Sequence, residues 1–154
     1  MFAVEGWSLR RAVIGDAGRA RDLVRAVYGK YVAAMGRESR PMTADYKAAI
    51  ENHQVWIVED GGEMLAVLVL IAEPDAMILE NVAVSERLQG RGVGSRLLVF
   101  AEAEAARQGY DEVLLYTNEM MGDNAAYYAR RGYEETHREP FASTQVIHMK
   151  KRVA

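Results

Sequence analysis

A glycine-rich turn, QGRGVG at residues 89–94, constrains this chain more than any other stretch. The apolar segment ILENVAV (78–84) precedes it, and a helix-forming segment follows from Val93. Glycines at three alternate positions leave backbone N–H groups unobstructed at a helix N-terminus, where about half a unit of positive charge collects. A tight connection with convenient glycines is the simpler explanation. Gln89 and Arg91 beside the glycines favour a phosphate-binding site instead.

Two common phosphate-binding patterns fit the turn poorly. A nucleotide P-loop continues after its last glycine with Lys and then Ser or Thr, whereas Gly94 is followed by Ser95 and Arg96. A dinucleotide-binding turn has glycine or alanine at the position of Ser95 and normally follows the first strand of its fold. Here the turn follows the fourth predicted strand. The P-loop is therefore excluded, and a dinucleotide-binding redox domain is disfavoured.

Hydrophobic periodicity predicts strands and helices within one domain, residues 1–154. Strands are expected at 7–13, on both sides of the turn at 60–62, and at 77–84, 113–117, 133–136 and 146–150. Helices are expected after Asp16 as an N-cap, at 43–50 with Thr43 as the cap, at 93–108 and at 124–131. The order β-α-α-β-β-β-α-β-α-β-β predicts a mixed α/β fold, with a central sheet and helices on both faces.

The composition limits the class of protein. Hydrophobic residues make up 50% and charged residues 27%, which suits a globule with a sizeable core. The net charge of −3 gives no reason to expect nucleic acid or a membrane surface as a partner. The absence of cysteine excludes disulfides, thiolate metal sites and a cysteine nucleophile. Without a signal-peptide pattern, or an apolar run of the roughly 20 residues that a membrane helix needs, we expect a soluble cytoplasmic protein.

Beyond the turn, the chain resembles the GNAT superfamily of acyl-CoA-dependent N-acetyltransferases. QGRGVG matches the family's Q/R-x-x-G-x-G/A motif, with LENVAV before it and LLYTN and NAAYYARRGY after it, in the family's order and approximate spacing. The resemblance covers nearly the whole chain, from SLRRAV to VIHMKKRV. It implies a GNAT-type fold, with a twisted, mostly antiparallel sheet of about seven strands, and acetyl-CoA as the co-substrate.

The resemblance also implies where acetyl-CoA binds. In this family the fourth and fifth strands diverge and the pantetheine arm lies between them. Backbone groups of Val82 and Val84 would pair with that arm like an added strand, a backbone N–H near Val82 or Ala83 would hold the oxyanion, and the turn would hold the pyrophosphate. The implied cofactor-binding residues are Val82, Ala83, Val84, Gln89, Gly90, Arg91, Gly92, Val93, Gly94, Ser95, Asn118, Asn124 and Tyr127.

Acetyl transfer requires a proton donor for the departing thiolate. The resemblance places it on Tyr128, five residues before Tyr133, and a phenol with a pKa of about 10 stays protonated at neutral pH. Adjacent helix positions lie about 100° apart, so we expect Tyr127 to form a wall of the cofactor site instead. Asn124, one turn before Tyr128, either contacts the cofactor or caps the helix. Simple packing is the alternative role for both tyrosines.

Glu80 is the candidate base, because a carboxylate within an apolar strand is costly unless it faces water or a partner. It would take the amine proton directly or through a water. The alternatives are a solvated carboxylate at a strand end and one that only binds the substrate ammonium. Strand alternation predicts one face made of Ile78, Glu80, Val82 and Val84, and an opposite face made of Leu79, Asn81 and Ala83.

We therefore predict an N-acetyltransferase in which a primary amine attacks acetyl-CoA directly in a ternary complex. The three histidines share no metal-ligand spacing, so no metal is expected. The sequence also has no paired Ser and His of the kind that would indicate a covalent intermediate. A non-catalytic acyl-CoA-binding or regulatory module on the same fold is the alternative function. Because dimers are common in the family, the resemblance also implies a homodimer. The acceptor is expected near 28–46 and 137–144, where Arg37 or Arg40 suits a carboxylate and Glu38 or Asp45 an amine.

Overall fold

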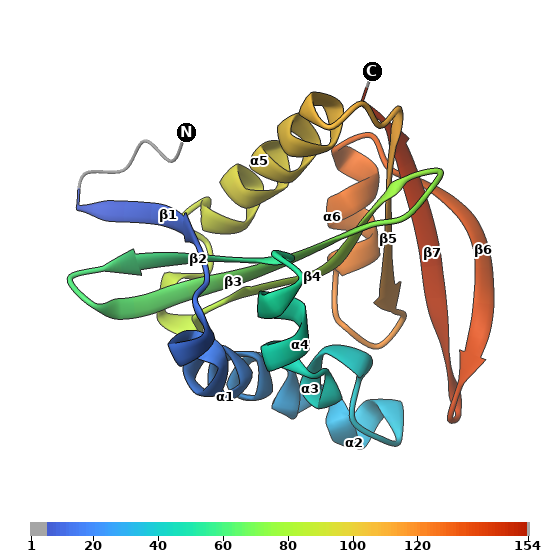
Figure 1. Ribbon diagram of the computed structural model, residues 1–154. Coiled ribbons are helices and arrows are strands. Elements are labelled where there is room, and N and C mark those ends of the chain that lie inside the picture. The colour runs from blue at the N-terminus through green and yellow to red at the C-terminus, as the bar shows by residue number, and fades with distance from the viewer. Residues whose placement is uncertain (1–5, 154) are drawn as a thin grey trace.

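The computed structural model describes residues 6–153 (Figure 1). Within this part, seven strands form one sheet in the spatial order β1-β2-β3-β4-β5-β7-β6. Only β4 and β5 run parallel; all other described neighbours are antiparallel. The strands are β1 (Trp7–Arg11), β2 (Val55–Asp60), β3 (Glu63–Ala72), β4 (Met77–Val84), β5 (Glu112–Asn118), β6 (Glu134–Phe141) and β7 (Thr144–Arg152). The predicted mixed, mostly antiparallel sheet is confirmed.

Helices cover both faces of this sheet, as predicted (Figure 1). One face carries α1 (Ala17–Tyr28), α2 (Val32–Met35), α3 (Arg40–Thr43) and α4 (Tyr46–Glu51), and the other carries α5 (Val93–Arg107) and α6 (Asn124–Arg130). Single 3-10 turns occur at η1 (Ile14–Asp16), η2 (Gly29–Tyr31) and η3 (Glu86–Leu88). Each face has its own core: Leu97 of α5 packs with Leu68 and Leu115 of the sheet, and Val24 of α1 packs with Ile57 and Val67 of the sheet.

In place of the predicted helix 43–50, the structure has two short helices: α3 ends at Thr43 and α4 begins at Tyr46. Ala44 is extended (φ −66°, ψ 151°) and separates α3 from α4, so Thr43 ends a helix instead of capping one. The cap of α4 is Asp45, whose carboxylate accepts a hydrogen bond from the Ala48 backbone N–H. The other predicted helices and strands are present, but some ends differ; the largest difference is in β6, which continues to Phe141 where the prediction ended at Thr136.

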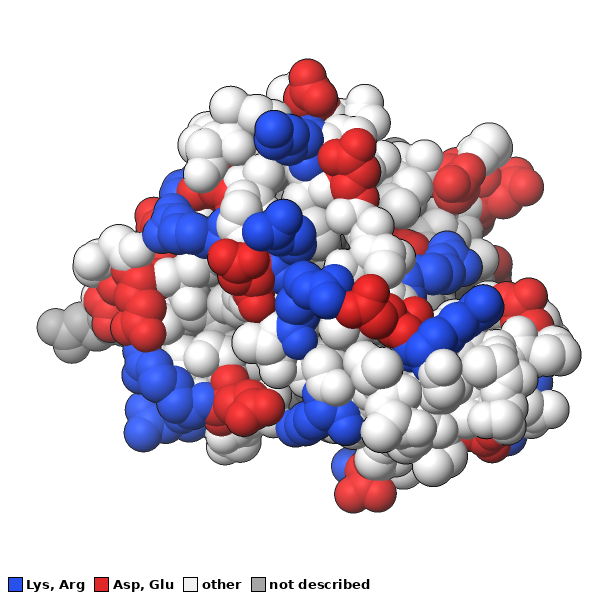
Figure 2. All heavy atoms as spheres, turned by 90° about the horizontal axis from the view of Figure 1, so that it is seen from below, with Lys and Arg blue, Asp and Glu red and all other residues white. Residues whose placement is uncertain are grey.

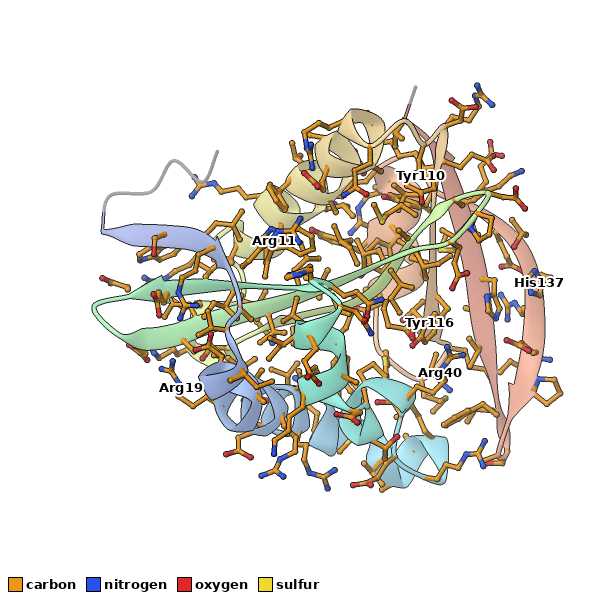
Figure 3. The ribbon with its side chains drawn as sticks, viewed as in Figure 1. Arg11, Arg19, Arg40, Tyr110, Tyr116 and His137 are labelled. Carbon is orange, nitrogen blue, oxygen red and sulfur yellow. The ribbon has the colours of Figure 1, made fainter. Side chains whose placement is uncertain are left out.

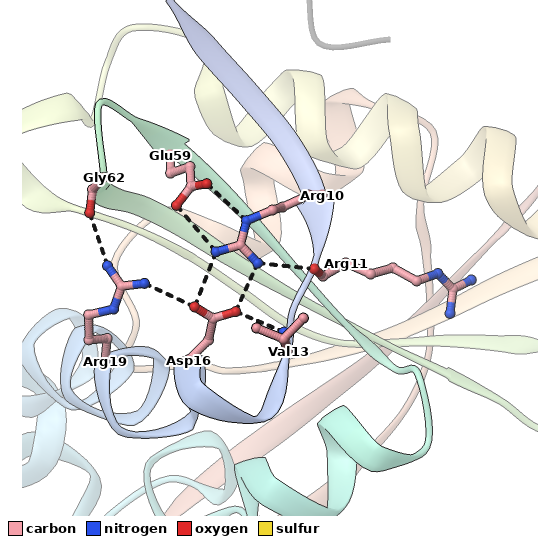
Figure 4. Close-up of polar contacts among 7 residues, drawn as sticks. All are labelled: Arg10, Arg11, Val13, Asp16, Arg19, Glu59 and Gly62. Carbon is pink, nitrogen blue, oxygen red and sulfur yellow. Dashed lines mark hydrogen bonds and ion pairs between the residues drawn. The ribbon is translucent and has the colours of Figure 1, made fainter.

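Asp16 directly precedes α1, as predicted, but its side chain does not cap that helix. Its buried carboxylate accepts hydrogen bonds from Arg10 and Arg19, each at 2.9 Å, and from the Val13 backbone N–H at 2.8 Å (Figure 4). Arg10 also donates to Glu59 of β2 at 2.9 Å. This cluster joins β1 and β2 to the start of α1, and the Arg10 guanidinium holds the pKa of Asp16 at about 2.

A β-bulge interrupts β4 at Glu80. Asn81 pairs with Val69 of β3 while Leu79 pairs with Leu70, so Glu80 is an extra residue without a partner in that ladder. An extra residue reverses the alternation that follows it. Leu79 lies in the core beneath α5, but Ala83, also an odd-numbered residue, lies in the core beneath α1. The expected single face of Leu79, Asn81 and Ala83 is therefore wrong.

β4 and β5 separate at the same place. Their parallel pairing covers three residue pairs, from Met77–Val113 to Leu79–Leu115, and ends directly before the bulge. Beyond it, β5 continues to pair with β7 as far as Asn118. The sheet therefore opens between the second half of β4 and the end of β5.

The surface over α1–α4 carries basic and acidic side chains interspersed with one another (Figure 2).

None of the helices in residues 6–153 has the length and apolarity that a membrane crossing requires.

Candidate active site

A cavity of about 490 Å³ lies beside the opening in the sheet, on the side of the glycine turn. β4 supplies Val82 and Val84, and η3 supplies Leu88. The remaining lining comes from the turn and the start of α5 (Gln89, Gly90, Gly92, Val93, Gly94, Ser95 and Leu98), from α1 and η2 (Val27, Tyr28, Lys30 and Tyr31), and from α6 and its end (Asn124, Tyr127, Tyr128 and Arg131).

The glycine turn presents the N-terminus of α5 to this cavity. Gly90 (φ 84°) and Gly92 (φ 80°) adopt left-handed conformations that favour glycine, and Gly92 is the N-cap of α5 without a capping side chain. The first N–H groups of a helix have no intrahelical acceptor, so they are available to an anion. The Gln89 side-chain amide donates a 3.1 Å hydrogen bond to the Val84 carbonyl, which ties the turn to β4.

Arg131 joins this helix terminus from the end of α6, and sequence reasoning missed it. Its guanidinium donates to the Ser95 hydroxyl at 2.8 Å and stacks 3.7 Å above the centre of the Tyr127 ring. The Ser95 and Tyr127 hydroxyls are themselves 2.8 Å apart. Helical spacing could have indicated this residue, because Arg131 follows Tyr127 by four residues and so lies on the same helix face. The arrangement adds a fixed positive charge to the N-terminal end of α5.

The backbone of β4 is exposed to the opening at Val82 and Val84. Ser85 donates its N–H to the Leu65 carbonyl, so Ser85 and Leu65 form a hydrogen-bonded pair. Alternation along an antiparallel ladder then directs the polar groups of Ala83 toward β3 and those of Val82 and Val84 away from it. No β5 residue within the described chain pairs with them, because the β4–β5 ladder ends at Leu79.

A second cavity, of about 240 Å³, lies on the other side of the opening. Its lining includes Glu80 and Tyr116 from the sheet, Arg37 and Ser39 from the segment between α2 and α3, Arg40 from the start of α3, and Glu139 and Phe141 from β6. Tyr28, Val82, Asn124 and Tyr128 line both cavities. The two spaces therefore meet at Tyr128. Tyr28 was another residue that sequence reasoning missed; its hydroxyl lies 2.8 Å from Asn81 Oδ1 and 3.0 Å from the Val82 carbonyl.

Tyr128 lies at this junction with its hydroxyl unpaired in the described part of the chain. Its ring packs edge-on against Tyr127 and Tyr133, with centroids 5.4 and 5.9 Å away. Within residues 6–153, no side-chain hydrogen bond involves its hydroxyl, which is free to donate into the junction. Burial raises the pKa of Tyr128 to about 12, and the neighbouring Tyr127 contributes to the rise. The phenol therefore remains protonated at physiological pH.

Glu80 faces the second cavity and is held by two donors. The Tyr116 hydroxyl donates a 2.7 Å hydrogen bond to it, and Arg40 forms an ion pair at 3.2 Å. Figure 3 shows Arg40 and Tyr116 beside one another at the end of β5, where the guanidinium lies 4.8 Å from the ring centre. The Glu80 side chain is 15% exposed, so it sits at the cavity wall and not on open surface.

Some predicted cofactor residues lie outside the first cavity. Asn118 lines the second cavity, where it is buried and donates a 2.9 Å hydrogen bond to Thr144. Ala83 is fully buried beneath α1, so its side chain lines neither cavity. Arg91 is exposed and is not among the lining residues of either cavity. All other predicted cofactor residues line the first cavity.

The β6–β7 hairpin holds a cluster with metal-ligand chemistry. His137, Glu139 and His148 place ligand atoms within 4.8 Å of one another, and the two imidazoles stack with centroids 4.2 Å apart. His148 also contacts the Glu139 carboxylate. Sequence spacing did not indicate this cluster, because strand pairing places His137 opposite His148. Of the three residues, only Glu139 lines the second cavity, so the cluster lies outside the junction.

Comparisons with known proteins show that the class of protein with this fold and site is the acetyltransferases. Residues 51–135 match the family described as "Acetyltransferase (GNAT) domain". This match covers more than half of the chain and includes β4, the glycine turn, α5 and α6. The chain belongs to the GNAT acetyltransferase family.

Solved structures show the same fold. The PaiA N-acetyltransferase of Thermoplasma acidophilum, in complex with coenzyme A, has a TM-score of 0.79 and 15% identity, with 95% of this chain and 98% of that chain covered. The ribosomal-protein-S18-alanine N-acetyltransferase of Escherichia coli has a TM-score of 0.72 and 17% identity, with 96% and 94% covered.

A curated relative is similar over a shorter stretch. The aminoalkylphosphonate N-acetyltransferase of Salmonella typhimurium is 34% identical over 59 residues. This stretch spans 38% of this chain and 38% of that relative.

Proposed function

We propose that this protein is an N-acetyltransferase that moves the acetyl group of acetyl-CoA to a primary amine by direct attack within a ternary complex. The observation that carries the proposal is the meeting of two cavities at Tyr128, beside the exposed backbone of Val82. One cavity offers a helix N-terminus and Arg131 for phosphate groups, and the other offers Glu80 for an ammonium group. Family membership supports acetyl transfer, and the PaiA complex with coenzyme A supports that cofactor.

In this proposal the first cavity holds the CoA portion. The N–H groups of Gly90 and of Gly92 to Ser95 bind the pyrophosphate, and Arg131 adds charge. Those of Gln89 and Arg91 already donate to the Glu86 and Leu88 carbonyls. The outward-directed backbone groups of Val82 and Val84 bind the pantetheine arm as an added strand would. The Gln89 and Tyr28 side chains already contact these two carbonyls, so they would have to yield them to the arm.

The second cavity holds the acceptor. Glu80 binds the ammonium and accepts the proton that leaves it, and the free amine then attacks the thioester carbonyl carbon. Of the two backbone N–H groups expected to stabilise the resulting oxyanion, that of Val82 can do so, because that of Ala83 is directed toward β3. When this intermediate collapses, the C–S bond breaks and Tyr128 donates its phenolic proton to the thiolate. The extra proton that the attacking nitrogen still carries then passes to the Tyr128 phenolate, which leaves the amide and restores the phenol. The name of the Salmonella relative supports an amine as the acceptor.

A turnover assay tests this function. Acetyl-CoA is incubated with the protein and a panel of small primary amines, and both thiol release and the mass of the N-acetylated amine are measured. We expect amine-dependent thiol release with one acetyl group gained per thiol released. Intact-protein mass spectrometry without amine should show no acetylated protein, because attack is direct. If CoA binds but no amine gains an acetyl group, a non-catalytic acyl-CoA-binding or regulatory module explains the site instead.

A further inference from the structure

Two hydrogen-bond donors that line the second cavity have no partner within the described chain. Ser39 as a residue is 6% exposed, and its buried hydroxyl makes no hydrogen bond with residues 6–153. The Arg37 guanidinium forms no hydrogen bond or ion pair with residues 6–153; its contact is with the Phe141 ring, whose centre lies 4.3 Å away. A buried hydroxyl without a partner costs about 1–3 kcal/mol, so such a group in a cavity wall points to a ligand.

Both donors come from the same short segment. Residues 36–39 connect α2 to α3, and Arg40 begins α3, so Arg37, Ser39 and Arg40 line the cavity from one side. Stacking on Phe141 holds the Arg37 guanidinium in place while leaving its N–H groups available. A planar guanidinium presents several donors in a fixed arrangement that matches carboxylate and phosphonate oxygens.

The acidic groups of this cavity are already engaged. Glu80, which Tyr116 and Arg40 hold in place, receives the amine in the proposed function, and Glu139 contacts His148. The unused groups are therefore donors, and one of them is a permanent positive charge. A second cation on the acceptor would find no free carboxylate, whereas an oxyanion would find Arg37 and Ser39.

We propose that the acceptor is a small zwitterionic amine, which carries a carboxylate or phosphonate bound by Arg37 and Ser39 in addition to the amine that enters at Glu80 and Tyr128. This inference rests on the proposed function and specifies its substrate class. The cavity volume of about 240 Å³ lies below the roughly 300–1,000 Å³ typical of pockets for drug-sized ligands, which favours a small metabolite.

Matched acceptors test the inference. Aminoalkylphosphonates and ω-amino acids with one to five carbons between the groups are compared with amino alcohols and diamines of equal length, at equal concentrations of free amine. We expect at least one anion-bearing series to exceed its neutral and cationic counterparts by about tenfold or more in kcat/KM, as a charge-assisted hydrogen bond predicts. The two anion-bearing arms show which oxyanion the site prefers.

Variants connect that preference to the two donors. Arg37→Gln and Ser39→Ala should each raise KM for the anionic acceptor about tenfold, with KM for acetyl-CoA and kcat/KM for the amino alcohol unchanged. Ser39→Ala should leave the free energy of unfolding unchanged or raise it, because it removes an unsatisfied buried hydroxyl. Arg21→Gln, on the exposed surface of α1, is the matched control and should change nothing.

The outcomes separate the inference from the proposed function. Equal turnover of amino alcohols or diamines would overturn the zwitterion assignment while acetyl transfer to amines stands. An anion preference that survives both variants would overturn the roles of Arg37 and Ser39. If no amine of any series is acetylated, the proposed function fails and the inference fails with it.

Discussion

The Tyr116 hydroxyl on β5 donates a 2.7 Å hydrogen bond to the Glu80 carboxylate on β4, across the place where the two strands separate. Glu80 is also the extra residue of the β4 bulge, so the bulge and the bond together direct the carboxylate into the second cavity. Burial, with the Glu80 charge, raises the pKa of Tyr116 well above its usual value, so the phenol stays a donor at any working pH.

Tyr116→Phe removes this bond and keeps the ring. We expect KM for the acceptor to rise about tenfold, because a hydrogen bond to a charged group is lost, while KM for acetyl-CoA stays constant. Steady-state kinetics with each substrate varied in turn measures both constants. A change confined to KM for acetyl-CoA would contradict the assignment of Glu80 to the acceptor side.

Arg131→Gln should weaken the binding of CoA about tenfold, because it removes the fixed positive charge beside the start of α5. Acetyl-pantetheine lacks the pyrophosphate, so its kcat/KM should be unaffected. Isothermal titration with CoA and turnover with acetyl-pantetheine provide the two measurements. Arg130→Gln is the control, since Arg130 is exposed and does not line the cavity. Equal effects of the two variants would show that Arg131 has no specific role.

The glycine turn could be predicted from sequence because its geometry is local. Gly90 and Gly92 need positive φ, and α5 begins directly after them, so six consecutive residues contain the whole signal. Hydrophobic periodicity, which is also a local signal, predicted the order of the strands along the chain. Resemblance to a family supplied Tyr128, whose function depends on two cavities that no local pattern describes.

The bulge at Glu80 was not predictable in this way. Strict alternation assumes a regular strand, and the sequence of β4 contains no glycine or proline to mark an interruption. Arg131 and Tyr28 were missed because their importance comes from elements that fold together from distant parts of the chain. Asp16 was predicted to cap a helix because the sequence does not show that Arg10, on the preceding strand, binds its carboxylate instead.

Asp16→Asn should lower the free energy of unfolding by about 2 kcal/mol or more at pH 7. The folded-state pKa of about 2 lies below the ordinary value of 3.8, and each pKa unit corresponds to about 1.4 kcal/mol. A depressed carboxyl pKa gives stability that is present above the unfolded-state value and lost as pH falls toward the folded-state value. The wild type should therefore lose this contribution between about pH 5 and pH 2, and the variant should not.

Urea unfolding at pH 7 and pH 3 measures the difference. Asp22→Asn is the control, because its carboxylate is 70% exposed and pairs only with an exposed Arg21 in the described chain. We expect that substitution to change the free energy of unfolding by less than about 1 kcal/mol. Equal losses for the two variants would show that the Asp16 cluster does not stabilise the fold.

Removal of metal ions should leave acetyl transfer unchanged. The residues shared by the two cavities are Tyr28, Val82, Asn124 and Tyr128, none of which has the imidazole, thiolate or carboxylate side chain that catalytic zinc requires. Turnover is measured before and after dialysis against a chelator. Loss of activity that a divalent metal restores would contradict the proposed chemistry, and His137→Ala would then show whether the β6–β7 cluster holds that metal.

The most direct test is the rate of thiol release by the wild type and by Tyr128→Phe, at saturating acetyl-CoA and acceptor between pH 7 and pH 10. Proton donation to the leaving thiolate predicts a fall of at least about tenfold in kcat for the variant, because such groups typically contribute 10²- to 10⁴-fold. With the pKa of Tyr128 at about 12, the wild-type rate should not decline up to pH 10. A variant that turns over at the wild-type rate across this range would contradict the assignment of Tyr128 as the acid.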